Sequence, residues 1–191
     1  LCRSIFPCGT VYADENTGYF TGVANPAKAR EMLKEAGYDN TPVVLMRPTD
    51  LASIAKIPLV AKQQLEAAGF KVDFQQMDWA SLLARRAKKD APAAGGWNIF
   101  LTAWTAGDIS NPLAMAMLNA KGDTGWFGWQ NEPRIESLKA SFARAATTEE
   151  KKKLASQIQA VAFETATHAP LGQYRSPTVI RSNVSGILQT P

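Results

Sequence analysis

The chain has 191 residues, of which 46% are hydrophobic and 20% are charged, and its formal net charge at pH 7 is +4. These proportions are ordinary for a globular protein, and the apolar runs are all interrupted before they reach the roughly 18 residues of a membrane-spanning helix. The positive charges are scattered or lie on segments with helical periodicity, which favours solvated helix faces over a nucleic-acid-binding surface. We therefore expect one sizeable domain and no nucleic-acid partner.

The two cysteines of the chain, Cys2 and Cys8, lie close together near its start. Such a pair can form a local disulfide in an oxidising compartment, remain as two free thiols, or supply half of a metal site. A zinc site would need two more ligands, and the single histidine, His168, lies far along the chain. We predict that the two cysteines are joined in oxidised protein, because the intervening residues, with Pro7 among them, can bring the two Cα atoms within disulfide range.

The first periodic element follows an irregular stretch. Asn25 and Pro26 predict a helix start, because an asparagine side chain can accept bonds from unpaired backbone N–H groups and proline suits the first helical position. Apolar residues then repeat at helical spacing as far as Gly37, a residue type that suits the left-handed end of a helix. The pattern predicts a short amphipathic helix.

Strand and helix patterns alternate in the next part of the chain. The apolar, β-branched segment 42–47 predicts a buried strand, and residues 70–77 alternate between apolar and polar as a half-buried strand does. Residues 58–69 carry apolar positions on one helical face. Asp78 predicts the cap of another helix, and residues 97–103 predict a third strand that ends at the following tryptophan. This order predicts an α/β fold with a parallel-rich sheet flanked by helices.

Three further helices are predicted in the second half of the chain. A second Asn-Pro pair, at residues 111–112, precedes apolar residues that run to Leu118. Two longer helices follow a glycine-rich aromatic loop, and the second of them opens with a capping box formed by Thr147 and Glu150. Residues 170–191 predict an extended final segment.

The sequence lacks the patterns that catalysis or cofactor binding would require. Nucleophilic catalysis needs a nucleophile with a positioned base, and the single histidine, His168, stands near a predicted helix end with no GxSxG turn elsewhere in the chain. No glycine-rich phosphate loop and no cluster of metal ligands occurs in the sequence. We therefore expect no catalytic residue, no metal and no cofactor.

Aromatic and acidic residues gather after the third predicted strand and in the glycine-rich loop. Ligands favour the carboxyl ends of the strands in open α/β sheets. Aromatic walls with one carboxylate suit an amphipathic ligand that carries an amine, because the carboxylate pairs with the cation while the rings cover apolar surface. The alternative is that the tryptophans are core residues and the aspartate caps a turn, and spacing alone favours neither. The predicted ligand-binding residues are Trp104, Thr105, Asp108, Phe127 and Trp129, with Trp126 beside them in the loop.

Several segments form an ordered series that covers nearly the whole chain, from about residue 25 to residue 186. They are the helix NPAKAREMLKEAGY, the helix and strand VAKQQLEAAGFKVDFQQMDWASL, the loop FLTAWTAGDISNP and the late helix TEEKKKLASQIQAVAFETATHAPLGQY. The series resembles the dipeptide/oligopeptide-type family 5 extracellular solute-binding proteins of bacterial ABC importers, in which the third segment corresponds to a ligand loop.

The resemblance implies a longer protein that folds as two lobes around a cleft and closes on its solute by a hinge movement. It implies that residues 1–24 form an irregular segment near the hinge and that residues 25–169 form the α/β ligand-binding lobe. Residues 170–191 would then be an extended segment that returns toward the missing lobe. It also implies a periplasmic location, where a disulfide between Cys2 and Cys8 would persist.

The leading hypothesis is a binding protein that captures peptides or peptide-like solutes and delivers them to the permease subunits of an ABC importer, and that is not an enzyme. An alternative from another class is an α/β enzyme domain whose remaining catalytic residues lie in the missing part of the chain. A third, a basic module that binds nucleic acid, is disfavoured by the scattered charge.

Overall fold

The computed structural model describes residues 2–18, 20, 23–166, 168–177 and 179–187. The chain divides into two compact units. Residues 23–103 form the first, which we call the sheet unit, and the described residues of 1–22 and 104–191 form the second, which we call the helical unit. This division into compact units does not use the boundaries expected for this chain, at residues 24 and 169, and those boundaries stay a prediction.

The sheet unit is built on three strands in the order β2-β1-β3. They are β1 (Val43–Pro48), β2 (Val72–Met77) and β3 (Ile99–Phe100). The central strand β1 pairs in parallel with both neighbours. The predicted parallel sheet is therefore confirmed, although β3 has two residues and ends four positions before Trp104, where the sequence pattern placed its end.

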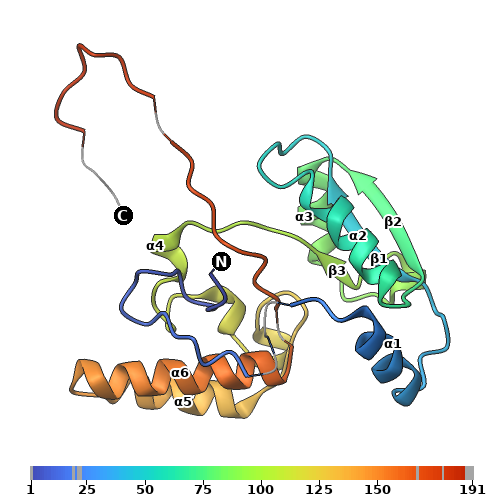
Figure 1. Cartoon of the computed structure of the whole chain (residues 1–191), viewed down its shortest axis with the longest axis horizontal. Helices are drawn as coiled ribbons and strands as arrows, with labels where there is room; N and C mark the ends of the chain where they lie inside the picture. Colours follow the sequence, from blue (N-terminus) through green and yellow to red (C-terminus); the bar gives the residue numbers. More distant parts are fainter. Residues whose placement is uncertain (1, 19, 21–22, 167, 178, 188–191) are drawn as a thin grey trace. The chain divides into compact units, whose positions relative to one another are not determined.

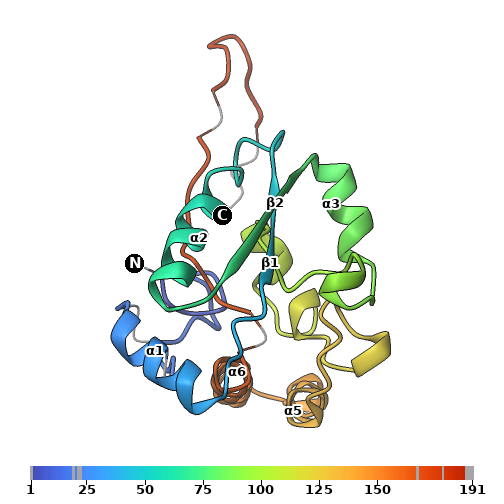
Figure 2. The same ribbon diagram turned by 90° about the vertical axis from the view of Figure 1, so that its right-hand side faces the viewer.

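Two helices cover the two faces of this sheet. Figure 2 shows α2 (Ile57–Ala67) and α3 (Trp79–Arg86) on opposite sides of the strands. On the α3 face, Leu82 packs with Val44 and Met46 of β1, and all three side chains are buried. Parallel neighbouring strands need a long connection between the end of one and the start of the next. The helices α2 and α3 lie in these connections and provide that length.

The helix α1 (Pro26–Glu35) opens the sheet unit and begins as the sequence predicts. The side chain of Asn25 accepts a hydrogen bond from the backbone N–H of Lys28 at 3.0 Å, and Pro26 occupies the first helical position. The helix buries none of its residues, and Arg30 ties it to the end of α2 by donating to the carbonyl oxygen of Ala67 at 2.6 Å.

The helical unit is built on two helices that lie side by side, α5 (Pro133–Arg144) and α6 (Thr148–Glu164) (Figure 1). The capping box predicted at the start of α6 is present, with the side chains of Thr147 and Glu150 each bonded to the other residue's backbone N–H. The buried apolar residues between and around the helices are Ile5, Phe6, Met115, Leu118, Ala120, Ile135, Phe142, Ala155, Ile158 and Ala162.

The segment at the start of the chain is fastened to α6 rather than folded into helix or strand. In its described part, residues 2–18 and 20, no helix or strand is present. Gln159, which is fully buried, accepts from the hydroxyl of Ser4 and from the backbone N–H of Ile5, and donates to the carbonyl oxygens of Asp14 and Asn16. These four bonds use both ends of one side-chain amide, so the segment and the helix satisfy each other's polar groups.

A disulfide closes the start of this segment. Cys2 and Cys8 are joined, with their Cα atoms 5.7 Å apart. The backbone N–H of Cys8 also donates to the side chain of Gln173 at 3.0 Å, which ties the disulfide loop to the final segment of the chain.

The prediction of a helix from residue 112 to Leu118 is wrong. The chain turns there, and only η2 (Ala116–Leu118) has helical geometry, of the 3-10 type. The side-chain oxygen of Asn111 accepts a hydrogen bond from the backbone N–H of Leu113 at 2.9 Å. The backbone carbonyl oxygen of Asn111 accepts from the backbone N–H of Met115. An asparagine that bonds to its own following backbone stabilises a turn at the expense of a helix.

Residues 168–177 and 179–187, the described part of the segment predicted to be extended, contain no helix or strand. Most of this segment is exposed, including its larger apolar side chains Leu171, Tyr174, Val179, Ile180, Val184 and Ile187. None of the helices described in the two units is both long and apolar enough to cross a membrane.

Candidate functional site

All five predicted ligand-binding residues fall in the helical unit, and three rings make contact there. The ring centroids of Trp104 and Trp126 are 5.3 Å apart, and those of Trp126 and Phe127 are 4.8 Å apart in an edge-to-face arrangement. We call these three residues the aromatic cluster. Trp126 joins the two predicted residues Trp104 and Phe127, although it was not among the predicted binding residues.

The indole nitrogen of Trp104 is an unusual atom of this cluster, because it is a hydrogen-bond donor that the structure leaves unused. It is buried and has no hydrogen-bond partner among the described residues. A buried donor without a partner costs about 1–3 kcal/mol of stability, so such groups are rare in native structures. The donor is enclosed by the protein, so what the aromatic cluster presents in this structure is apolar surface.

Thr105 and Asp108 form a pair at the short helix α4 (Ala106–Ile109). Thr105 caps this helix, and its hydroxyl donates to Oδ2 of Asp108 at 2.7 Å. Both side chains are exposed. The pair has the geometry of a helix cap, which the sequence left as an alternative, while a carboxylate with two oxygens keeps acceptor capacity for a ligand amine. Whether Asp108 contacts a ligand therefore stays a prediction.

The glycine-rich loop that carries Trp126, Phe127 and Trp129 has a tightly constrained backbone. A Cβ atom at Gly125 would lie 2.6 Å from the carbonyl oxygen of Asn119, so only glycine fits there. Trp129, the fifth predicted residue, has a φ of 49° and donates its backbone N–H to the carbonyl oxygen of Trp126 at 2.8 Å. Left-handed backbone at a residue other than glycine costs roughly 1–2 kcal/mol.

A cavity of about 270 Å³ lies against this loop. We call it the loop cavity. Its wall comes from the η2 turn, the loop itself and the end of α6, and includes no charged side chain. The amide nitrogen of Gln130 donates to the hydroxyl of Thr165 at 2.9 Å and so joins the loop to α6. The lining residues are Met117, Asn119, Trp126, Phe127, Gly128, Gln130, Thr165 and Ala166.

The loop cavity shares Phe127 with the predicted site and adds polar residues that sequence reasoning missed. Gln130 directly follows Trp129, so its place beside the aromatic loop could have been noticed. Thr165 gives no such signal, because it lies 35 positions further along the chain and reaches the cavity only through the packing of α6.

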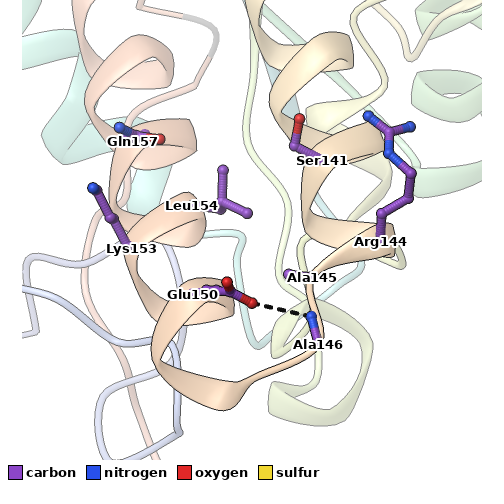
Figure 3. A pocket seen from close by; sticks show the side chains of 8 residues that line it. All are labelled: Ser141, Arg144, Ala145, Ala146, Glu150, Lys153, Leu154 and Gln157. Atoms are coloured by element: carbon purple, nitrogen blue, oxygen red, sulfur yellow. Dashed lines mark hydrogen bonds between the residues drawn. The ribbon is translucent and has the colours of Figure 1, made fainter.

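A second and larger hollow, of about 530 Å³, lies over the turn between α5 and α6. Figure 3 shows Arg144 and Lys153 on opposite sides of it, while Glu150 is directed at the backbone N–H of Ala146. That carboxylate is engaged at the helix start, and its backbone bond with Thr147 holds the pKa of Glu150 below its usual value. The charged groups do not converge on one point, so this hollow is a weaker candidate for a ligand.

The single histidine, His168, is largely enclosed by the protein. Burial lowers the pKa of His168 to about 4, so the imidazole is neutral at pH 7. Among the residues that the structure describes, no group of three or more His, Cys, Asp or Glu side chains is placed to hold a metal ion.

Comparison with known proteins identifies the family. The model of the middle region of the bacterial extracellular solute-binding proteins, family 5, matches residues 3–126. Probable peptide ABC transporter periplasmic-binding protein y4tO of Sinorhizobium fredii is 31% identical over 175 residues, which cover 92% of this chain and 33% of the relative. Di/tripeptide-binding protein 4 of Pseudomonas aeruginosa is 29% identical, over 87% of this chain and 32% of the relative.

The fold is also shared with a solved structure. The crystal structure of the ABC transporter substrate-binding protein CtaP from Listeria monocytogenes superposes with a TM-score of 0.63 at 22% identity, over 82% of this chain and 32% of that one. The predicted fold class, part of a periplasmic-binding-protein lobe, is thus confirmed. The chain belongs to family 5 of the bacterial extracellular solute-binding proteins, and it spans about a third of the length of the relatives that it matches.

Proposed function

We propose that the full-length protein containing this chain is the extracytoplasmic solute-binding component of an ABC importer. It captures peptides or peptide-like solutes and delivers them to a membrane permease. The observation that carries this proposal is the family match over residues 3–126. The names of the two relatives, one a probable peptide transporter component and the other a di/tripeptide-binding protein, support peptides as the solute class.

The proposed site uses the predicted residues in two roles. Trp104, Phe127 and Trp129 provide apolar surface that faces the cleft, and Asp108 pairs with a cationic group such as a peptide amino terminus. Thr105 holds the carboxylate of Asp108 in place through its hydroxyl, 2.7 Å away. In this scheme the isolated lobe binds the solute weakly or not at all, because half of the cleft comes from the other lobe.

The proposed location is the periplasm. The joined pair Cys2 and Cys8 supports it, because disulfides persist in oxidising compartments outside the cytoplasm. We further propose that the protein binds its solute without transforming it. The relatives support this, since they are named as binding proteins.

The test begins with the solute that co-purifies with the full-length protein. Native-state purification followed by denaturation and mass spectrometry is expected to release peptides. Sugars, opines or metal complexes as the sole released solutes would contradict the proposal. The identified peptide is then titrated calorimetrically into ligand-free protein, and its N-acetylated form serves as the control. If an amine pairs with a carboxylate, acetylation weakens binding by at least tenfold, about 1.4 kcal/mol.

A further inference from the structure

We propose that the hollow over the turn between α5 and α6 is a docking surface for an acidic segment of a partner protein. Such a segment carries two carboxylates with an apolar side chain between them. We call this surface the turn hollow. The inference goes beyond the proposed function, because none of the residues that line the hollow is a predicted ligand-binding residue.

The cations of α5 and α6 fall into two groups. The paired ones, each 3.1 Å from a carboxylate oxygen, are Arg134, Lys139 and Lys152. Arg144, Lys151 and Lys153 have no ion-pair partner among the described residues. All three lie at the end of the helix pair where the turn is, and two of them, Arg144 and Lys153, line the turn hollow from opposite sides (Figure 3).

The acidic residues nearest to these cations are already engaged. The carboxylate of Glu150 accepts from the backbone N–H groups of Ala146 and Thr147, at 3.1 and 3.2 Å, and so closes the start of α6. Glu149 pairs with Lys152 at 3.1 Å. The positive charge at the rim of the turn hollow is therefore not neutralised from within the described part of the chain.

The lysines of α6 have no local explanation. A positive charge suits the last turn of a helix, where Arg144 lies, and the glutamates at positions 149 and 150 suit a first turn. Lys151 and Lys153 follow that first turn directly, close to the positive end of the helix dipole, where a cation is not stabilised. Departures from a local preference without a compensating contact are expected at functional surfaces.

The floor of the turn hollow is apolar. Figure 3 shows the side chain of Leu154 between α5 and α6, with Ala145 and Ala146 at the turn. The hollow measures about 530 Å³, within the range of about 300–1,000 Å³ of pockets that enclose small ligands, so it has room for more than one side chain.

The arrangement of charge and floor selects the occupant. A single small anion cannot pair with both Arg144 and Lys153, because the two cations stand on opposite sides and do not converge. Two carboxylates that flank an apolar side chain match both cations and the floor between them. A lipid bilayer fits less well, since its apolar part lies beneath a broad layer of headgroups and does not enter a hollow.

The first experiment measures binding of an acidic peptide to the full-length protein. The probe is Ser-Glu-Leu-Ala-Glu-Ser, acetylated and amidated so that its ends carry no charge, and equilibrium dialysis measures the bound fraction. The probe is expected to bind saturably, and its matched control with Gln in place of both Glu should bind about fivefold more weakly. Raising NaCl from about 50 to about 500 mM should weaken the acidic probe similarly, because salt screens exposed charges.

The second experiment tests the two rim cations. Arg144→Gln/Lys153→Gln should weaken probe binding about fivefold, or about 1 kcal/mol, as the loss of two exposed ion pairs of about 0.5 kcal/mol each predicts. Both side chains are exposed, so the melting temperature should stay at the wild-type value. Arg175→Gln/Arg181→Gln removes the same charge from exposed positions of the final segment and should bind the probe as the wild type does.

The third experiment locates the bound probe on the wild-type protein. Acetic anhydride modifies exposed lysine amines, and mass spectrometry quantifies each product. The probe is expected to protect Lys153 and to leave Lys56, an exposed lysine of the sheet unit, unprotected. This measurement and the salt dependence need no variant, so they stand even if the double substitution disturbs folding.

Several results would overturn the docking surface. They are equal binding of the acidic and neutral probes, wild-type affinity in Arg144→Gln/Lys153→Gln, and unchanged modification of Lys153. Equal protection of Lys153 by glutarate at the same concentration would make the hollow a small-anion site. Binding of phosphatidylglycerol vesicles through the same two cations, without binding of the probe, would make it a lipid-binding surface.

The proposed function is tested separately. Solute binding by Arg144→Gln/Lys153→Gln is expected to equal that of the wild type. A protein that captures no peptide solute but binds the probe through Arg144 and Lys153 retains the docking surface and loses the peptide function. A protein that captures peptide solutes but fails the probe tests shows the reverse.

Discussion

The hydroxyl of Ser4 donates a hydrogen bond to the side-chain oxygen of Gln159, 2.8 Å away and 155 positions later in the chain. The same oxygen accepts from the backbone N–H of Ile5, and the amide nitrogen of Gln159 donates to two carbonyl oxygens of the first segment. A single buried glutamine thus replaces the backbone partners that a strand or helix would have provided to this segment.

Replacing Gln159 with leucine should lower the free energy of unfolding by about 2–4 kcal/mol. The substitution leaves the Ile5 N–H and the Asp14 and Asn16 carbonyl oxygens without their partner, and each unsatisfied buried group costs about 1–3 kcal/mol. Urea unfolding of the full-length protein measures the change. Gln157→Leu, at an exposed position of the same helix, is the control and should change stability by less than about 0.5 kcal/mol.

Removing the disulfide should cost about 2 kcal/mol. The bond between Cys2 and Cys8 closes a short loop, and the chain-entropy relation gives that value for a loop of this length. Unfolding with and without reductant measures the difference, and the variant Cys2→Ser/Cys8→Ser should not respond to reductant. Two free thiols in freshly purified, non-reduced protein would contradict the prediction and weaken the proposed periplasmic location.

Replacing Asp108 with alanine in the full-length protein should reduce affinity for the co-purifying solute by roughly 2–5 kcal/mol. The loss arises because the cationic group of the ligand would be left without its partner. Calorimetric titration measures it, and Asp123→Ala, at another exposed aspartate of the same unit, is the control. If the affinity of Asp108→Ala stays within about threefold of the wild type, under 1 kcal/mol, the residue serves only to cap α4.

Stability should fall as the pH falls from about 6.5 to about 4, with a contribution from His168. Burial lowers the pKa of this imidazole in the folded protein from 6.5 to about 4, so the unfolded chain binds more protons in that interval. The contribution of His168 to the free energy of unfolding is fully present above pH 6.5 and is lost as the pH falls to about 4. It amounts to about 3 kcal/mol at most.

The variant His168→Gln should show a flatter dependence of the urea midpoint on pH between 4 and 6.5. Titration of the imidazole C–H signal by NMR provides an independent measurement. If the His168 imidazole in the folded protein titrates with a midpoint near pH 6.5, burial does not lower its pKa.

The sheet unit could be predicted from the sequence because its signals are local. The β-branched residues of β1, the alternation along β2 and the Asn25-Pro26 helix start each specify structure within a few positions. The prediction of a helix from residue 112 was wrong, and the reason is also local. The side chain of Asn111 bonds to the backbone N–H of Leu113, and an Asn-Pro pair is compatible with both outcomes.

The candidate site could be predicted only in part. The glycine-rich loop drew attention to Phe127 and Trp129, and the contact of Trp104 with Trp126 agrees with their grouping. Thr165 and Ala166 were missed because they reach the loop cavity through the packing of α6, which no sequence pattern encodes. The strand assumed to deliver Trp104 ends at Phe100, so position along a predicted strand was a weak guide to that residue.

The pairing of Ser4 with Gln159 sets an order of events as the chain is made. The sheet unit is continuous in sequence, so its strands and helices can assemble as soon as residue 103 has emerged. The first segment has no such option, because its buried partner lies 56 residues further on, which is about 3–11 s of translation at roughly 5–20 residues per second. During that interval Ile5 and Phe6 lack the α6 surface that later covers them. The disulfide between Cys2 and Cys8 constrains this segment only after the chain has reached an oxidising compartment.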